Sequence, residues 1–107
     1  MPERPLLVFF TSERSGPARR MESLLANLAR KERERLRVSR VDVDEHPDLA
    51  ERLDVREVPT LVLVSERKPV ARLEGRSSAP RIERMIGRHL ESQDRRNPAA
   101  VSSRTIG

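Results

Sequence analysis

The sequence predicts an α/β domain in which a four-stranded mixed sheet is flanked by helices, in the order β-α-β-α-β-β-α. Two largely apolar runs, 6–10 and 60–64, are short and bounded by polar residues, as is typical of strands buried on both faces. Other stretches space their apolar residues at i, i+3, i+4 and i+7, which indicates amphipathic helices. A length of 107 residues is enough for one hydrophobic core, so we expect a single domain.

The first half of the chain supplies two strands and two helices. After the strand at 6–10, helical spacing continues from Pro17 to about Arg35, and the proline suits a first helical turn. Segment 36–43 is rich in β-branched residues and is predicted to be a strand. Polar residues around Pro47 then open a short helix.

The second half begins with a predicted hairpin. Its strands are 60–64 and 70–73, its turn is 66–69, and Gly75 closes it. A last helix is expected over 80–90.

After Leu90 the apolar periodicity is lost, and Pro, Ser and Arg become frequent. We therefore expect residues 1–90 to form the domain and residues 91–107 to form a disordered tail.

Charge and hydropathy exclude some classes of protein. Charged residues make up 36% of the chain and the net charge is +5, but acids alternate with the arginines, as in 30–35. That pattern predicts solvated helix faces. No signal-like segment is evident and the run 6–10 is too short to span a bilayer, so a soluble cytoplasmic protein without a membrane partner is the expectation.

Several segments resemble the thioredoxin family. Residues 10–19 resemble the Phe-Trp-Ala-x-Trp-Cys-Gly-Pro-Cys-Lys motif, and 58–60 resembles the cis-proline loop. Segment 41–44 and Gly75 also fall at family positions. The resemblance implies a minimal thioredoxin-like fold without the usual N-terminal strand and helix. Because that strand would pair with 36–43, segment 36–43 is expected at a sheet edge.

The chain departs from this family at the residues that carry its chemistry. Ser15 and Ala18 stand where the nucleophilic and resolving cysteines would be, and the chain contains no cysteine. Disulfide exchange requires a thiolate, so we expect no enzyme of this kind and no catalytic residue. The vestigial motif is Ser15, Gly16, Pro17 and Ala18.

Three further replacements help to decide whether the cysteines were lost naturally or were removed by engineering. Phe9 stands where thioredoxins bury an aspartate that assists proton transfer, and Thr11 and Arg14 replace the two tryptophans of the motif. A buried carboxylate without that task is costly, so phenylalanine suits a redox-free core. An engineered Cys-less variant of a thiol-disulfide oxidoreductase is the alternative, but it does not explain these three residues.

The resemblance implies a binding groove that needs no thiol. In thioredoxins an extended substrate segment pairs with the backbone of the residue before the cis-proline, which is Val58 here. The leading hypothesis is a redox-inactive adaptor or chaperone-like protein that binds a protein or peptide, against the alternative that the proline is kept only for packing. The candidate binding residues are Arg14, Ser15, Gly16, Val58, Pro59 and Gly75.

Other functions are less favoured by the residues. A basic nucleic-acid-associated protein is an alternative, with tail arginines as contacts, but Phe9 and Phe10 are the sole aromatics and are expected to be buried. Ser15 has no histidine placed to activate it and is expected to cap a helix. The acidic segment 42–48 lacks the pattern of an EF-hand, so helix-capping acids are expected and no metal or cofactor.

The predicted edge at 36–43 invites pairing with another chain. Arg37, Ser39 and Arg40 are suited to blunting it. A protected monomer is left open, and so is pairing of this strand, either with a second copy in a homodimer or with a strand of another partner.

Overall fold

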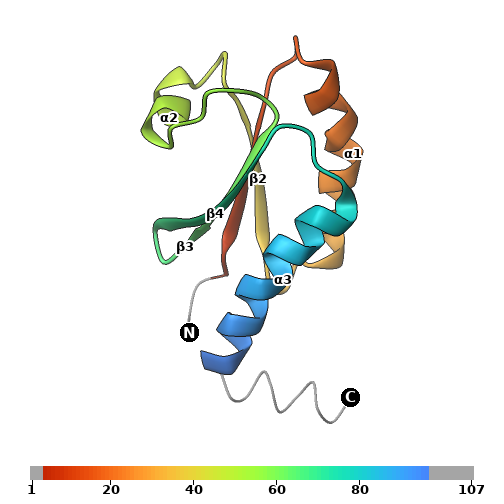
Figure 1. Ribbon diagram of the computed structural model, residues 1–107, viewed down its shortest axis with the longest axis vertical. Helices are drawn as coiled ribbons and strands as arrows, with labels where there is room; N and C mark the ends of the chain where they lie inside the picture. Colours follow the sequence, from red (N-terminus) through yellow and green to blue (C-terminus); the bar gives the residue numbers. More distant parts are fainter. Residues whose placement is uncertain (1–3, 97–107) are drawn as a thin grey trace.

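The computed structural model describes residues 4–96 and shows seven elements in the predicted order (Figure 1). The strands are β1 (Leu6–Thr11), β2 (Arg37–Asp42), β3 (Thr60–Ser65) and β4 (Lys68–Glu74), and the helices are α1 (Gly16–Lys31), α2 (Pro47–Arg52) and α3 (Ala79–Arg96).

The four strands form one mixed sheet in the order β2-β1-β3-β4. β1 runs parallel to β2, and β3 is antiparallel to both β1 and β4. β2 therefore lies at an edge, as the sequence predicted, and β4 forms the opposite edge. The two central strands, β1 and β3, correspond to the two apolar runs of the sequence.

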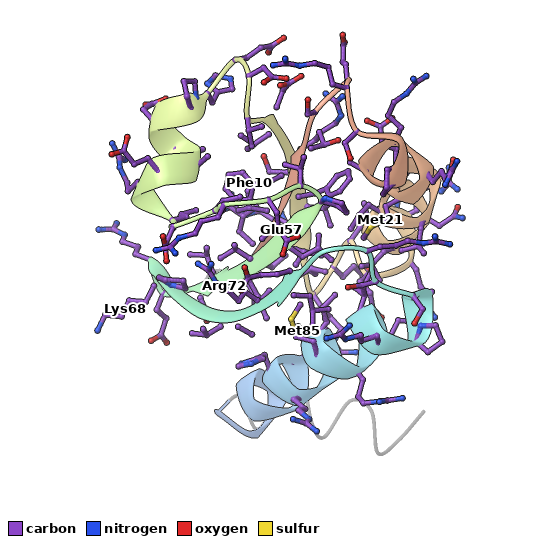
Figure 2. The ribbon with its side chains drawn as sticks, turned by 45° about the horizontal axis from the view of Figure 1, so that its top comes forward. Phe10, Met21, Glu57, Lys68, Arg72 and Met85 are labelled. Carbon is purple, nitrogen blue, oxygen red and sulfur yellow. The ribbon has the colours of Figure 1, made fainter. Side chains whose placement is uncertain are left out.

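Helices cover both faces of the sheet: α1 and α3 lie on one side and α2 on the other (Figure 1). Alternate residues of β1 divide between two buried clusters, with Leu7 and Phe9 in the cluster under α1 and α3, and Val8 and Phe10 in the cluster under α2. Met21 of α1 and Met85 of α3 pack at the first cluster (Figure 2). This two-sided burial explains why β1 is continuously apolar rather than alternating.

α1 ends earlier than the sequence predicted. It stops at Lys31 instead of continuing to about Arg35, and the N–H groups of Arg35 and Leu36 both donate to the Glu32 carbonyl, at 2.9 and 2.8 Å. The last deeply buried residue of the helix is Leu28, so the charged segment 32–35 has no apolar side chain to hold it on the sheet.

α3 is longer than predicted, which corrects the expected disordered tail for residues 91–96. These residues continue the helix to Arg96. They include Glu, Gln and Arg, which favour helix, and the first helix breaker is Pro98, so loss of the apolar pattern does not end the helix. The rest of the predicted tail, 97–107, lies outside the described residues.

The β3–β4 hairpin is tighter than predicted. Its turn consists of Glu66 and Arg67, which both have positive φ values of 53° and 69°, as type I′ turns require. β4 therefore begins at Lys68, and the pairing register shifts at Leu63/Val64.

Candidate functional site

The strand register gathers the predicted site at one end of the sheet. Phe10 pairs with Thr60, and Thr60 pairs with Glu74, so the loops that follow β1, precede β3 and follow β4 meet at this end. Thr11 pairs with Asp42, which adds the loop after β2. The fold thus brings the loops carrying all six predicted binding residues to the same end of the sheet.

Ser15 starts α1, as predicted. Its backbone is extended, with φ −100° and ψ 108°, and its side-chain oxygen accepts a hydrogen bond from the N–H of Ala18 at 3.2 Å. Gly16 and Pro17 form the exposed first turn, and Ala18 is fully buried. The vestigial motif therefore survives as a helix N-terminus whose Ser15 hydroxyl is a capping group.

Arg14 belongs to a polar network that ties two loops together. One Asp44 carboxylate oxygen accepts a hydrogen bond from Ser12 Oγ at 2.6 Å, and the other lies 2.7 Å from Arg14 Nη2. Ser12 Oγ also accepts from the Arg14 N–H at 3.2 Å. The Ser12 hydrogen bond first, and then Arg14, lower the pKa of Asp44, while Asp44 raises the pKa of Arg14.

Sequence reasoning did not assign Ser12 and Asp44 to the site. The serine two residues before Arg14 is the local signal, since such hydroxyls often bond the main chain two residues on. Asp42 also bonds the main chain two residues on, since its Oδ1 accepts a hydrogen bond from the Asp44 N–H at 2.8 Å. Asp42 was predicted among the helix-capping acids, but this bond stabilises the end of β2 instead of the start of α2. Asp48 does lie in the first turn of α2.

Val58 and Pro59 form the second part of the site. The peptide bond between them is cis, and Pro59 is buried. The Pro59 carbonyl accepts from the Gly75 N–H at 2.8 Å, and Thr60 Oγ1 donates to the Glu57 carbonyl at 2.8 Å. Both bonds fix the loop on either side of Val58.

The main chain of Val58 is itself unpaired. Within residues 4–96 neither its N–H nor its carbonyl has a hydrogen-bond partner, although the residue is half-buried and packs against the cluster under α2. A free N–H and a free carbonyl on one residue can pair with the main chain of an extended peptide ligand.

Glu57 and Gly75 lie next to this loop. Gly75 has φ +80°, a value that favours glycine, and a Cβ placed on it would lie 4.0 Å from Glu57 Oε2. Figure 2 shows Glu57 in the loop that leads into β3. This exposed carboxylate is a further site residue that the sequence did not single out, and its position directly before Val58 is the signal.

Within residues 4–96, the residues considered for nucleophilic catalysis, metal binding and base stacking do not form such sites. His46 occupies the N-cap position of α2 without a side-chain capping bond, and His89 is on α3. Among residues 4–96 no three His, Asp or Glu side chains are grouped closely enough to hold a metal ion. Phe9 and Phe10 are buried, as predicted. No helix in the described part of the chain is long and apolar enough to cross a membrane.

Comparison with known proteins identifies the family. The thioredoxin family model matches residues 1–88. A thioredoxin-like protein of Synechocystis sp. is 32% identical over 79 residues, which cover 74% of this chain and 75% of that protein. The thioredoxin of Alicyclobacillus acidocaldarius is 28% identical over 89 residues, covering 83% and 85% of the two chains.

The same family appears among solved structures. The germline-specific thioredoxin Deadhead of Drosophila melanogaster superposes with a TM-score of 0.75 at 29% identity, over 79% of this chain and 80% of that one. These matches confirm the predicted thioredoxin-like fold. Although it contains no cysteine, the chain belongs to the thioredoxin family.

Proposed function

We propose that this chain is a redox-inactive thioredoxin-like domain that binds an extended segment of another protein beside Val58. The observation that carries the proposal is that the main chain of Val58 has no hydrogen-bond partner among the described residues, 4–96, although the loop around it is fixed. The partner is a protein or peptide, and the role is that of an adaptor or chaperone-like subunit.

The side chains of the former thiol site support the loss of redox activity. Thiol-disulfide exchange passes through a mixed disulfide, which neither the Ser15 hydroxyl nor the Ala18 methyl can form. Ser15 Oγ is engaged as a cap and Ala18 is packed in the core. We therefore expect the purified protein not to accelerate insulin reduction by a dithiol at any pH.

The surroundings of Val58 support binding of main chain rather than of a charged group. Arg14 is directed to Asp44 by their 2.7 Å ion pair, so its charge is already compensated. Glu57 is exposed, and Gly75 carries no side chain. An extended peptide pairing with Val58 would gain two main-chain hydrogen bonds, each contributing about 0.5–1.5 kcal/mol.

The rival nucleic-acid function receives less support from the described residues. Both aromatic side chains are buried, which leaves no stacking surface there. Several arginines are held by acids or carbonyls instead of being grouped: Arg14 by Asp44, Arg40 by Glu22, Arg56 by Asp54, and Arg72 by Leu53 and Asp54.

An NMR titration tests the proposal. A binding peptide is selected from an array of unstructured peptides and added to ¹⁵N-labelled protein. We expect the largest amide shifts at Val58, Gly75 and Ser15, and slower hydrogen exchange at Val58, because its free N–H becomes bonded.

The matched variants are Val58→Asp and Val70→Asp. Val70 lies on β4 and is exposed by 41%, so its replacement controls for the added charge. Val58→Asp should abolish the shifts and Val70→Asp should keep them, with both variants shown to be folded by thermal melts. Peptide shifts centred away from Val58, or binding to DNA that falls steeply with salt, would contradict the proposal.

A further inference from the structure

We propose that β2 pairs antiparallel with β2 of a second copy of this chain, around a two-fold axis at Ser39. The pairing would join two four-stranded sheets into one continuous sheet. This inference does not depend on the peptide-binding proposal. It concerns the edge of β2 that faces away from β1, whereas the peptide-binding proposal concerns the loop at Val58.

The hydrogen-bond pattern shows which main-chain groups of β2 are free. The Arg37 N–H donates to the Pro5 carbonyl at 2.9 Å, and the Val43 N–H donates to the Thr11 carbonyl at 3.0 Å. Because main-chain groups alternate in direction along a strand, the odd-numbered residues of β2 bond to β1. The N–H and carbonyl groups of Val38 and Arg40 therefore point to the open edge.

The ends of the strand are already engaged. The Asp42 carbonyl accepts from the N–H groups of Glu45 and His46, at 3.1 and 2.9 Å. The Leu36 N–H donates to the Glu32 carbonyl at 2.8 Å. Within residues 4–96, Val38 and Arg40 are thus the outward-facing residues of β2 whose N–H and carbonyl both lack a partner.

The other edge of the sheet is protected, and this contrast favours β2 as the pairing strand. β4 contains Pro69, which has no N–H, and it carries a register shift where it meets β3 at Leu63/Val64. Proline and bulges are common means of blocking edge pairing. β2 contains neither proline nor glycine.

Charge and free groups together select the register. Residues directly opposite each other must point to the same face, so the two-fold axis lies at a residue and not between residues. An axis at Arg40 would place two arginines opposite each other, which is destabilising. An axis at Val41 would pair Arg40 with Asp42, whose carbonyl is already in use.

An axis at Ser39 uses the free groups without these conflicts. It pairs Val38 of one copy with Arg40 of the other, so both free N–H groups and both free carbonyls of each strand are satisfied. The small Ser39 side chains meet on the axis. The Arg40 charge is compensated within its own chain by Glu22 at 2.8 Å. An axis at Val38 would instead need the occupied Leu36 N–H.

The arrangement has a consequence for the peptide-binding site. The loops around Val58 and Ser15 lie at the end of the sheet where β1 and β2 finish. Antiparallel pairing of β2 sends these ends in opposite directions. A dimer would therefore present its two sites at opposite ends of the joined sheet.

Cysteine cross-linking tests the register, because the chain contains no other cysteine. Ser39 residues on the axis form a non-hydrogen-bonded pair with Cα atoms about 4.5 Å apart, within the range of about 4.4–6.8 Å that a disulfide accepts. Ser39→Cys, oxidised with copper phenanthroline at micromolar concentration, should give a covalent dimer on a non-reducing gel.

The matched control is Arg37→Cys, on the same face of the same strand. The two introduced thiols would be separated by about four residues along the strands, roughly 13 Å, so they should cross-link much more slowly. Equal cross-linking of the two variants, or faster cross-linking of Arg37→Cys, would overturn the register.

Val38→Pro separates pairing from folding. It removes an outward N–H and leaves the β1–β2 hydrogen bonds intact, so sedimentation velocity should show the wild type as a dimer and this variant as a folded monomer. A wild type that stays monomeric up to its solubility limit would overturn the proposal.

Discussion

Ser12 Oγ donates a hydrogen bond to Asp44 Oδ2 across 2.6 Å and so joins the loop after β1 to the loop after β2. Ser12 is buried, whereas the Arg14 side chain that pairs with the other carboxylate oxygen is 83% exposed. Exposed ion pairs are screened by solvent and contribute little. The serine is therefore the partner that most strongly fixes the ionised form of Asp44.

The first prediction concerns acid stability. The lowered pKa of Asp44 means that its ionised form stabilises the folded chain above the ordinary aspartate value of about 3.9, and that this stabilisation is lost as pH falls through the lower folded-state pKa. Asp44→Asn should therefore lose less stability than the wild type below about pH 4, as measured by urea unfolding. Glu45→Gln, at the exposed neighbouring residue, is the control and should follow the wild type. If the free energy of unfolding fell with pH in the same way for all three proteins, this role of Asp44 would be refuted.

The second prediction compares two buried threonines. Thr11 is fully buried, and its Oγ1 has no hydrogen-bond partner within the described residues. Valine has nearly the same shape without the unsatisfied hydroxyl, so Thr11→Val should raise the free energy of unfolding by about 1 kcal/mol.

Thr60→Val is the matched opposite case. Thr60 is 1% exposed, but its Oγ1 donates to the Glu57 carbonyl at 2.8 Å. Its replacement leaves that carbonyl without its partner and should lower the free energy of unfolding by about 1 kcal/mol. Denaturant melts of both variants measure the difference, and changes of the same sign would contradict it.

The third prediction concerns Arg72, which reaches from β4 to the end of α2 (Figure 2). Its guanidinium donates to the carbonyls of Leu53 and Asp54, the latter at 3.0 Å. Arg72→Met keeps the apolar stem and removes both charged donors, so it should lower the free energy of unfolding by about 1.5–3 kcal/mol. Arg76→Met, at an exposed position after β4, should have little effect, and an equal loss in both would contradict the role of Arg72.

Features decided by short-range pattern were accessible from the sequence. The apolar runs predicted β1 and β3 because strands buried on both faces cannot alternate with polar residues. Ser15 followed by Gly16 and Pro17 predicted the start of α1, since a cap and a first-turn proline act locally. The edge position of β2 followed from the family resemblance.

Features decided by distant contacts were not accessible. The predicted ends of α1 and α3 were wrong by several residues, because apolar spacing alone does not set where a helix ends. Ser12 and Asp44 are 32 residues apart, so no local pattern pairs them. The lack of a hydrogen-bond partner for the Val58 main chain within residues 4–96 likewise depends on how distant segments fold around it, which no local pattern reports.

The last prediction asks whether the former thiol site still supports redox chemistry. Ser15→Cys with Ala18→Cys places two thiols at the first turn of α1, where the helix N-terminus lowers the pKa of the first thiol. We expect the double variant to form an intramolecular disulfide readily. Mass spectrometry before and after thiol alkylation measures it.

A double variant that forms the disulfide is not thereby an efficient catalyst of disulfide reduction. Phe9 is 2% exposed and belongs to the same buried cluster as Ala18, so no proton acceptor is available beneath the second thiol. General acid–base assistance contributes about 10²–10⁴ in rate, and the double variant should therefore reduce insulin slower than a thioredoxin by a factor in that range.

Adding Phe9→Asp to the double variant should recover part of this rate, because a carboxylate would then lie in the core beside the second sulfur. Burial of that carboxylate should also lower the free energy of unfolding by several kcal/mol. Phe9→Asn in the same background is the control: it makes a similar cavity but accepts no proton, so it should be destabilised without gaining rate. Steady-state insulin reduction and thermal melts of the three proteins measure both effects. Full activity in the variant that retains Phe9, or equal recovery with asparagine, would show that the buried phenylalanine is not what limits the site.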